Sequence, residues 1–264
     1  METMTTHIRF LGMAGYEIVS PTHRILIDPF LTGNPSAPMS HEDVEKPDVI
    51  LVTHAAYDHL GDAPAIAKRT GAPVVCGGDV KAVLLEHGIP HTQIQPTVWG
   101  IVVEVGGVIV RPVESHHWSQ TQLQNGQYVS GVPMGFIIEP EPGMRIYHCG
   151  DTAIFGDMKL IRQLYQPTIG LMGCANGQEL LRRAQFPGKL LTGEMSPREA
   201  GLASEFLGLK LAIASHYLNL QDETELREVT EFIAAVHEFD TSGTRKAISM
   251  EPGEVLELHS DQFV

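Results

Sequence analysis

Cysteine is scarce in this sequence, and the few cysteines are poorly placed for cross-linking. Cys76, Cys149 and Cys174 are the only three in 264 residues, and no two of them form a C-x-x-C pair. An odd and widely spaced set argues against a disulfide framework and against a cysteine-ligated structural zinc site. The pattern is typical of a protein from a reducing compartment.

Long apolar runs and a basic leader are also missing. Crossing a bilayer takes about 20 consecutive apolar residues, and no stretch of this sequence approaches that length. The first ten residues, METMTTHIRF, contain no basic region followed by an apolar run, so they are unlike a signal peptide. We therefore expect a cytoplasmic protein with no membrane partner.

Positive charge is the third shortage. The chain has 18 Lys and Arg against 32 Asp and Glu, which gives a formal net charge of −14. Nucleic-acid binding relies on cations that displace counterions from phosphates, so we expect no nucleic-acid partner. A small anionic substrate stays compatible with the composition because a bound metal ion can reverse the local field. We expect a small-molecule substrate, and nothing in the sequence opposes a homo-oligomer.

The remaining composition is that of an ordinary globular domain. Hydrophobic residues make up 43% of the chain and charged residues 19%, and 264 residues are enough to bury a large core. We expect a single domain over residues 1–264. Residues 174–193 show no hydrophobic period and carry Arg182, Arg183 and Lys189, so we interpret them as an inserted loop covering a site.

Hydrophobic periodicity predicts a strand-rich first half and an alternation of helices and strands in the second half. The predicted strands are 8–19, 24–28, 49–53, 73–76, 98–105, 108–113, 136–139, 145–148, 169–172, 211–214, 246–250 and 254–258. The predicted helices begin near residue 63 and cover 79–87, 158–165, 196–207 and 224–239. Gly106 with Gly107, and Pro142 with Gly143, separate strand pairs as hairpin turns do. This order favours an α/β fold in which two sheets pack face to face with helices outside.

Residues 53–59, which read THAAYDH, carry the strongest local signal for chemistry. They directly follow the predicted strand 49–53, so His54, Asp58 and His59 leave one strand end together. Imidazole and carboxylate ligands suit zinc, manganese or iron. The alternative is a polar turn that contains two histidines by chance.

Three more predicted strands end in residues that could bind a metal. His116 and His117 follow strand 108–113, Asp151 follows strand 145–148, and His216 follows strand 211–214. Ligands delivered from several strand ends are how a rigid scaffold fixes a metal site. Together these segments predict one metal centre.

These segments resemble the metallo-β-lactamase superfamily, and within it the branch that includes ascorbate-6-phosphate lactonase. The resemblance is carried by T-H-x-x-x-D-H at 53–59, G-D-T at 150–152 and the late histidine at 216, with support from residues 25–35, 58–62 and 155–158. It covers nearly the whole chain in the right order. It implies a four-layer αββα sandwich and a metal-dependent hydrolase, and it is specific for the fold rather than for the substrate.

Carried over to this chain, the resemblance implies two adjacent sites for a divalent metal, zinc or manganese. The first would use His54, the residue at position 56 and His117, with His116 as the alternative to His117. The second would use Asp58, His59 and His216, and Asp151 would bridge both. His117 is preferred because the family places a small residue two positions before this ligand, and Ser115 fits.

Position 56 departs from the family, because alanine stands where the resemblance expects histidine. A methyl group cannot coordinate a metal, so we expect the second site to be filled and the first to be weak or empty. Ala56 could mark a natural one-metal or inactive variant, or an engineered substitution for histidine made to hold substrate without turnover. Retention of every other ligand favours the engineered substitution, and we expect reduced activity in this form.

The implied chemistry is hydrolysis of a small ester, lactone or phosphoester by a metal-bound hydroxide. Asp58 and Asp151 would position the water and accept its proton. Trp118 could form a wall of the substrate pocket or belong to the core, and Arg182, Arg183 or Lys189 could bind an anionic group or remain solvated. A catalytically silent binding or scaffold protein is the alternative class, and a metal-dependent oxidoreductase is a third.

Two further residues have open roles. Asp28 ends strand 24–28 and could either orient a ligand histidine or cap the following turn. His41 lies in a loop that could reach the site. We interpret the remaining histidines as ordinary surface or core residues.

Overall fold

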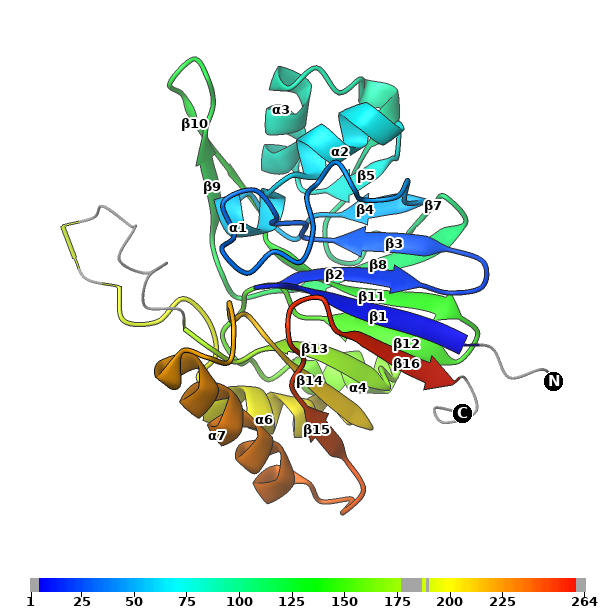
Figure 1. Cartoon of the computed structure of the whole chain (residues 1–264). Coiled ribbons are helices and arrows are strands. Elements are labelled where there is room, and N and C mark those ends of the chain that lie inside the picture. The colour runs from blue at the N-terminus through cyan, green and yellow to red at the C-terminus, as the bar shows by residue number, and fades with distance from the viewer. Residues whose placement is uncertain (1–4, 177–186, 189, 260–264) are drawn as a thin grey trace.

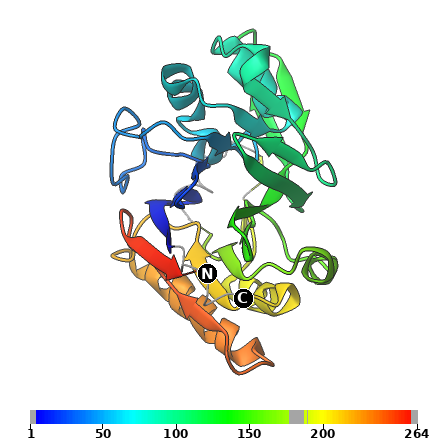
Figure 2. The same cartoon turned by 90° about the vertical axis from the view of Figure 1, so that its right-hand side faces the viewer.

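Two sheets lie face to face at the centre of the molecule, with helices on their outer sides (Figures 1 and 2). The computed structural model describes residues 5–176, 187–188 and 190–259. Each of the two sheets contains seven strands. This arrangement confirms the predicted α/β fold with four layers.

The first sheet has the strand order β16-β1-β2-β3-β4-β5-β6. Its strands are β1 (Thr5–Gly12), β2 (Gly15–Val19), β3 (Arg24–Ile27), β4 (Val49–Leu51), β5 (Val74–Cys76), β6 (Ile94–Pro96) and β16 (Val255–His259). Strands β16, β1, β2 and β3 pair antiparallel, whereas β3, β4, β5 and β6 pair parallel. The parallel half brings the ends of β3 and β4 to the same edge of the sheet.

The second sheet has the strand order β15-β14-β13-β12-β11-β8-β7. Its strands are β7 (Val103–Val105), β8 (Val108–Glu114), β11 (Met134–Glu141), β12 (Met144–His148), β13 (Ile169–Gly173), β14 (Leu211–Ser215) and β15 (Lys246–Ile248). Strands β12 to β15 pair parallel, so their C-terminal ends also share one edge. A separate hairpin of β9 (Ser119–Gln122) and β10 (Tyr128–Gly131) extends beside α3 (Figure 1).

Helices complete the outer layers on both sides. They are α1 (Tyr57–Leu60), α2 (Ala63–Thr70), α3 (Gly78–Glu86), the 3-10 helix η1 (His91–Gln93), α4 (Met158–Tyr165), α6 (Pro197–Leu207) and α7 (Glu223–Phe239). Side-chain alternation along the strands explains the layering. Ile25 and Ile27 of β3 pack into the core between the sheets, whereas Leu26 packs into a second core with Ile66 of α2 and Val80 of α3.

Several element boundaries differ from the sequence-based expectation. The single strand predicted at 8–19 is wrong: Gly12 and Met13 have positive φ of 89° and 54°, and the turn they form separates β1 from β2. The strand predicted at 98–105 is reduced to β7, and β6, β9 and β10 were not predicted. Helix α3 begins at Gly78, with Gly77 at its N-cap, one residue before the predicted start at residue 79. Within the described part of the chain, no helix combines the length and the apolar character that crossing a bilayer requires.

Candidate metal centre

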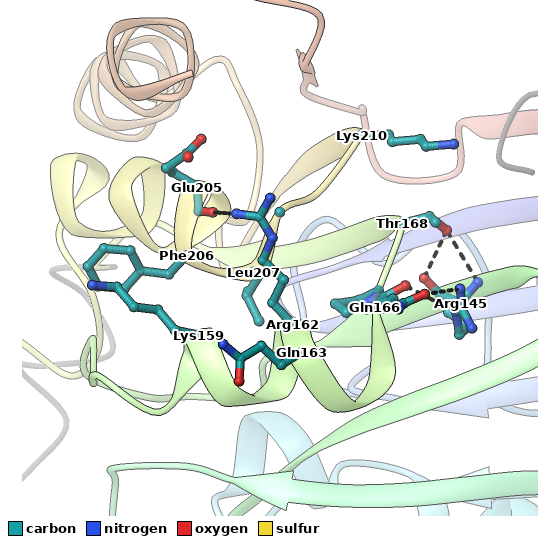
Figure 3. A pocket seen from close by; sticks show the side chains of 12 residues that line it. Arg145, Lys159, Arg162, Gln163, Gln166, Thr168, Glu205, Phe206, Leu207 and Lys210 are labelled. Carbon is teal, nitrogen blue, oxygen red and sulfur yellow. Dashed lines mark hydrogen bonds between the residues drawn. The ribbon is translucent and has the colours of Figure 1, made fainter. Parts of the chain in front are cut away.

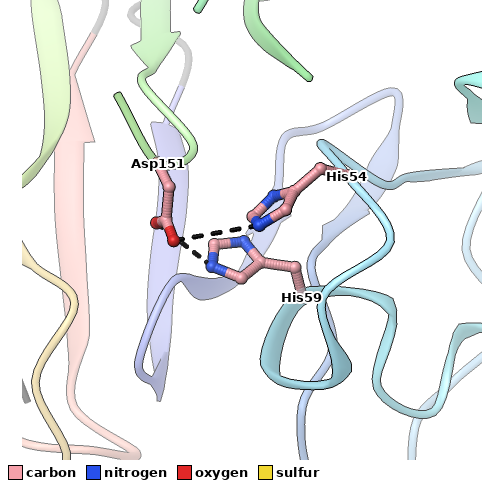
Figure 4. A group of neighbouring side chains, drawn as sticks. All are labelled: His54, His59 and Asp151. Atoms are coloured by element: carbon pink, nitrogen blue, oxygen red, sulfur yellow. Dashed lines mark ion pairs between the residues drawn. The ribbon is translucent and has the colours of Figure 1, made fainter. Parts of the chain in front are cut away.

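Four histidines turn the same ring nitrogen toward one carboxylate, that of Asp151. The Nε2 atoms of His59 and His216 lie 3.1 and 3.3 Å from Asp151 Oδ1. The Nε2 atoms of His54 and His117 each lie 3.8 Å from Asp151 Oδ2. Figure 4 shows His54 and His59 approaching Asp151 from the opposite side of the site.

Asp58 joins this group, because its Oδ2 atom lies 3.7 Å from Nε2 of His216. We call the resulting set the Asp151 cluster. It consists of His54, Asp58, His59, His117, Asp151 and His216. The structure therefore brings together all six side chains for which the sequence predicted metal binding.

The two sheets share the delivery of these side chains. His54 follows β4 of the first sheet, and Asp58 and His59 lie on the one-turn helix α1 just beyond it. His117, Asp151 and His216 follow β8, β12 and β14 of the second sheet. The cluster thus lies where the strand ends of both sheets meet.

Helix α1 is held against the residues that follow β3 by contacts around Gly61. Gly61 has a φ of 43°, and a Cβ at this position would overlap the backbone of Pro29 and Phe30. The carboxylate of Asp62 accepts hydrogen bonds from the backbone N–H groups of Leu31 and Thr32 at 2.8 and 2.7 Å. These contacts fix the helix that carries Asp58 and His59.

Asp28 orients His59 from the side opposite the cluster. Its Oδ2 atom lies 2.7 Å from His59 Nδ1 and also accepts a hydrogen bond from the Thr53 hydroxyl at 2.7 Å. Because a carboxylate here accepts, Nδ1 carries the hydrogen in the neutral ring, and the Nε2 lone pair faces Asp151. This contact supports the first of the two roles that the sequence left open for Asp28.

His216 has the same kind of support. Its Nδ1 atom lies 3.0 Å from the Ala175 carbonyl oxygen and is also in contact with the carboxylate of Glu194. Sequence reasoning missed Glu194. It lies just past the residues interpreted as an inserted loop and two positions before the N-cap of α6, where no strand end or motif drew attention to it.

Burial and mutual attraction shift the pKa values of the cluster in opposite directions. Burial lowers the pKa of His54 to about 3. Burial also opposes protonation of His59 and His216, but nearby carboxylates outweigh this effect and raise the pKa of both imidazoles. Asp151 acts on both rings, Asp28 acts in addition on His59, and Glu194 acts in addition on His216. These two imidazoles keep the pKa of Asp151 well below its usual range despite its burial.

The pKa values of His117, Glu194 and Asp58 also shift, each for a different balance of burial and neighbouring groups. Burial lowers the pKa of the His117 imidazole. Burial raises the pKa of Glu194 to about 8. For Asp58, the penalty of burial is overcome mainly by its contact with the His216 imidazole, so the pKa of its carboxyl is lowered. Asp58 and Asp151 are therefore ionised carboxylates in a buried site.

Several buried polar atoms in the cluster lack a hydrogen bond. Among the described residues, Nε2 of His54, of His59 and of His216 and Oδ1 of Asp151 have no hydrogen-bond partner. Unsatisfied buried groups are costly and uncommon in proteins, and here they converge on one place. Imidazole nitrogens and carboxylate oxygens that converge in this way fit a divalent zinc or manganese ion.

Three overlapping groups within this region have ligand atoms close enough to hold an ion, all within 4.8 Å of one another. They are His54, His59 and Asp151; Asp58, His59 and His216; and Asp151, Glu194 and His216. The second group contains the three ligands expected at the second site. Ala56, at the N-cap of α1, contributes only a methyl group to the first site.

Other residues singled out in the sequence lie outside the cluster. His116 is exposed, lies 2.9 Å from Glu114 Oε1 and stacks on Phe155 with ring centroids 4.5 Å apart. Trp118 is 55% exposed, so of its two alternative roles the one in the core is excluded, and its ring centroid lies 6.3 Å from that of His117. His41 lies 3.5 Å from Asp62 Oδ1, outside the cluster. Arg182, Arg183 and Lys189 lie outside the described residues.

A cavity of about 920 Å³ lies elsewhere, at the N-terminal ends of β13 and β14 (Figure 3). Its lining includes Arg145, Lys159, Arg162 and Lys210. The Asp151 cluster follows the opposite, C-terminal ends of β12 and β14. This cavity contains no residue of the cluster and takes no part in the candidate site.

Comparison with known proteins gives consistent matches. Residues 23–217 match the family model described as a beta-lactamase superfamily domain. A UPF0173 metal-dependent hydrolase from Thermococcus onnurineus (strain NA1) is 38% identical over 260 residues, which cover 95% of this chain and 99% of that protein. Another, from Rubrobacter xylanophilus, is 38% identical over 214 residues, or 80% of this chain and 81% of that one.

The solved structure of Igni18, described as a novel metallo hydrolase from the archaeon Ignicoccus hospitalis, matches across the molecule. Its TM-score is 0.73 at 26% sequence identity, over 96% of this chain and 98% of that one. The match therefore extends over most of the chain, including most of both sheets.

Proposed function

The chain belongs to the beta-lactamase superfamily, among the UPF0173 metal-dependent hydrolases, and from that premise we propose that it hydrolyses a small ester, lactone or phosphoester with the help of a bound divalent metal. One observation carries the proposal. Four imidazole Nε2 atoms face the Asp151 carboxylate, and three of them are buried without a hydrogen bond inside the described residues.

The proposed second site, formed by Asp58, His59, His216 and Asp151, holds the metal more tightly. The first site keeps His54, His117 and the shared Asp151, but Ala56 cannot supply the third histidine that the family has at this position. A bound zinc or manganese ion would lower the pKa of a coordinated water from about 15.7 to about 7 and would polarise a carbonyl or phosphoryl oxygen.

The chain's own carboxylates serve the proton transfers. His216 lowers the pKa of Asp58, so this carboxylate is ionised and can accept a proton from the attacking water. Asp151 is held in place by the surrounding imidazoles and orients that water. His117 is the most exposed of the four histidines, and the exposed ring of Trp118 beside it supplies an apolar surface for substrate at the entrance.

A catalytically silent metal-binding relative is the second candidate. Ala56 favours it, because loss of a ligand from a two-metal site removes more transition-state stabilisation than ground-state binding. In this reading the cluster still binds a metal and a small ligand, and only turnover is absent.

The Ala56→His variant tests the proposal, with Ala56→Gln as a control of similar bulk that lacks an imidazole. Metal content is measured after loading with Zn²⁺ or Mn²⁺, together with hydrolysis of a lactone, an aryl ester and an aryl phosphodiester. We expect about one metal per chain in the unmodified protein and in Ala56→Gln, and about two in Ala56→His. Hydrolysis by Ala56→His should rise by at least about tenfold, as expected when a metal site is completed.

The outcomes separate the candidates. If both proteins bind metal and neither hydrolyses any of the three substrates, the silent binding protein is favoured over the hydrolase. If neither protein binds metal, the Asp151 cluster is not a metal centre and both candidates fail.

A further inference from the structure

We propose that Glu194 is a positioning residue, which holds the His216 imidazole in the tautomer and orientation that metal binding requires. The inference rests on the proposed metal centre, and it assigns a role to a residue outside the six-residue cluster. Glu194 is only 6% exposed, and in the described part of the chain its carboxylate pairs with His216 alone.

The hydrogen-bond pattern around His216 fixes its tautomer. Nδ1 faces two oxygen atoms, the Ala175 carbonyl at 3.0 Å and the Glu194 carboxylate. A carbonyl oxygen can only accept a hydrogen bond, so Nδ1 carries a hydrogen. The lone pair of the neutral ring therefore resides on Nε2, which lies 3.3 Å from Asp151 and 3.7 Å from Asp58.

The same arrangement occurs on the other side of the cluster, where Asp28 contacts Nδ1 of His59. Thus the two histidines nearest to Asp151 Oδ1 each have a buried carboxylate behind the ring. Such a carboxylate fixes the ring and makes it a stronger metal ligand. Glu194 approaches from the Nδ1 side, so it is placed to orient His216 rather than to share its metal.

The backbone around Glu194 directs its side chain to this place. The backbone N–H groups of Gly193 and Glu194 donate to Asn176 Oδ1 at 2.6 and 3.2 Å, and the N–H of Met195 donates to the Thr152 carbonyl at 3.1 Å. On the sheet side, Gly173 at the end of β13 leaves room for the carboxylate. A Cβ at residue 173 would overlap Glu194 Oε2.

The test compares four variants of the full-length protein. Because burial raises the pKa of Glu194 to about 8, the measurements are made at about pH 9, where its carboxylate is ionised. Glu194→Ala removes the carboxylate, Glu194→Gln keeps its shape without the charge, and Gly173→Ala displaces it while keeping the charge. Glu141→Gln is the matched control. Glu141 is a buried glutamate at the end of β11, remote from the Asp151 cluster, and its carboxylate accepts a hydrogen bond from the Thr22 hydroxyl. The probes are Zn²⁺ affinity by chelator competition, the visible spectrum with Co²⁺, and the Nδ1 proton of His216 by NMR in the metal-free protein.

We expect Glu194→Ala and Gly173→Ala to weaken Zn²⁺ binding about 10- to 100-fold, with Glu194→Gln in between and Glu141→Gln unchanged. The Co²⁺ spectrum at saturation should stay the same, because the ligands are unchanged, and the Nδ1 proton signal should shift in both Glu194 variants. Unchanged Zn²⁺ affinity in Glu194→Ala would overturn the inference. A Co²⁺ spectrum showing a lost ligand would also overturn it, in favour of direct coordination. If the unmodified protein binds no metal, the failure lies with the proposed function.

Discussion

Single residues of the Asp151 cluster differ in how firmly they hold protons. The pKa of His54 is low because of burial, whereas carboxylates raise the pKa of His59 and His216. A metal can bind only to an Nε2 atom that has no proton. The protons on His59 and His216, whose pKa values are raised, must therefore leave before a metal can bind to these rings.

This difference predicts that metal binding releases protons. In the metal-free protein, the protons on His59 and His216 stabilise the fold below the ordinary histidine pKa of 6.5, and this stabilisation is lost as the pH rises through the raised values. Because Zn²⁺ must displace these protons, its apparent affinity should rise with pH above 6.5. Calorimetric titration in two buffers with different ionisation enthalpies measures the release. An identical binding enthalpy in both buffers would contradict the prediction, and His216→Asn should release fewer protons than the unmodified protein.

The sequence predicted the members of the Asp151 cluster but not the carboxylate contacts behind His59 and His216. The six cluster residues follow strand ends and match a known spacing, so pattern alone could locate them. Glu194 and the Nδ1 contact of Asp28 depend on where separate loops pass in space, which no local spacing reveals. The preference for His117 over His116 agrees with the structure, since only His117 faces Asp151.

Among the described helices and strands, the short helix α1 contains the most residues of the Asp151 cluster. It supplies Asp58 and His59, and it ends at Gly61, whose φ of 43° and contact with Pro29 leave no space for a side chain. Gly71, at the end of α2, has a φ of 72° but open space around it. These two glycines form a matched pair for testing how α1 is held.

We expect Gly61→Ala to lower both stability and metal affinity, and Gly71→Ala to lower stability alone. At Gly71, which has left-handed helical backbone angles, a side chain costs about 1–2 kcal/mol. Gly61 has a φ of 43° and a ψ of −126°, a combination that is almost restricted to glycine, so the cost there is larger. At residue 61 the overlap with Pro29 adds to this cost and moves α1, so Zn²⁺ affinity should fall as well. Urea unfolding and Zn²⁺ titration measure the two effects. Equal Zn²⁺ affinity in both variants would show that α1 is held by other contacts.

Elements with a strong hydrophobic period were predicted well, and polar or very short ones were not. Helix α4 begins and ends where the periodicity placed it, and α6 begins one residue after the predicted start, with Ser196 as its N-cap. The hairpin of β9 and β10 is polar on most of its surface, so no alternation marked it. Helix α1 has one turn, which is too short for a helical period.

Across the whole molecule, the Asp151 cluster joins the two sheets. His54, Asp58 and His59 belong to the first sheet's side, and His117, Asp151 and His216 to the second. A metal at this junction binds the folded state and has no comparable site in the unfolded chain, so it should stabilise the protein as a unit.

Chelation should therefore lower the melting temperature. Free metal at 100 times its Kd stabilises a protein by about 2.7 kcal/mol. For a chain of this size that corresponds to roughly 5–10 °C. Calorimetry with excess Zn²⁺ and with EDTA measures the difference. Asp151→Asn is the control that should lose the response, and an equal response in that variant would place the stabilising metal elsewhere.

Strand β1 pairs along one edge with β2 and along the other with β16, so that Thr5 lies opposite His259. During synthesis, β1 leaves the ribosome long before β16 exists, and its open edge waits for a partner from the far end of the chain. Strand β16 can pair with β1 only after α7 and β15, which precede it in the chain, have been synthesised. This edge of β1 therefore gains its partner only after every other strand of the two sheets has been synthesised.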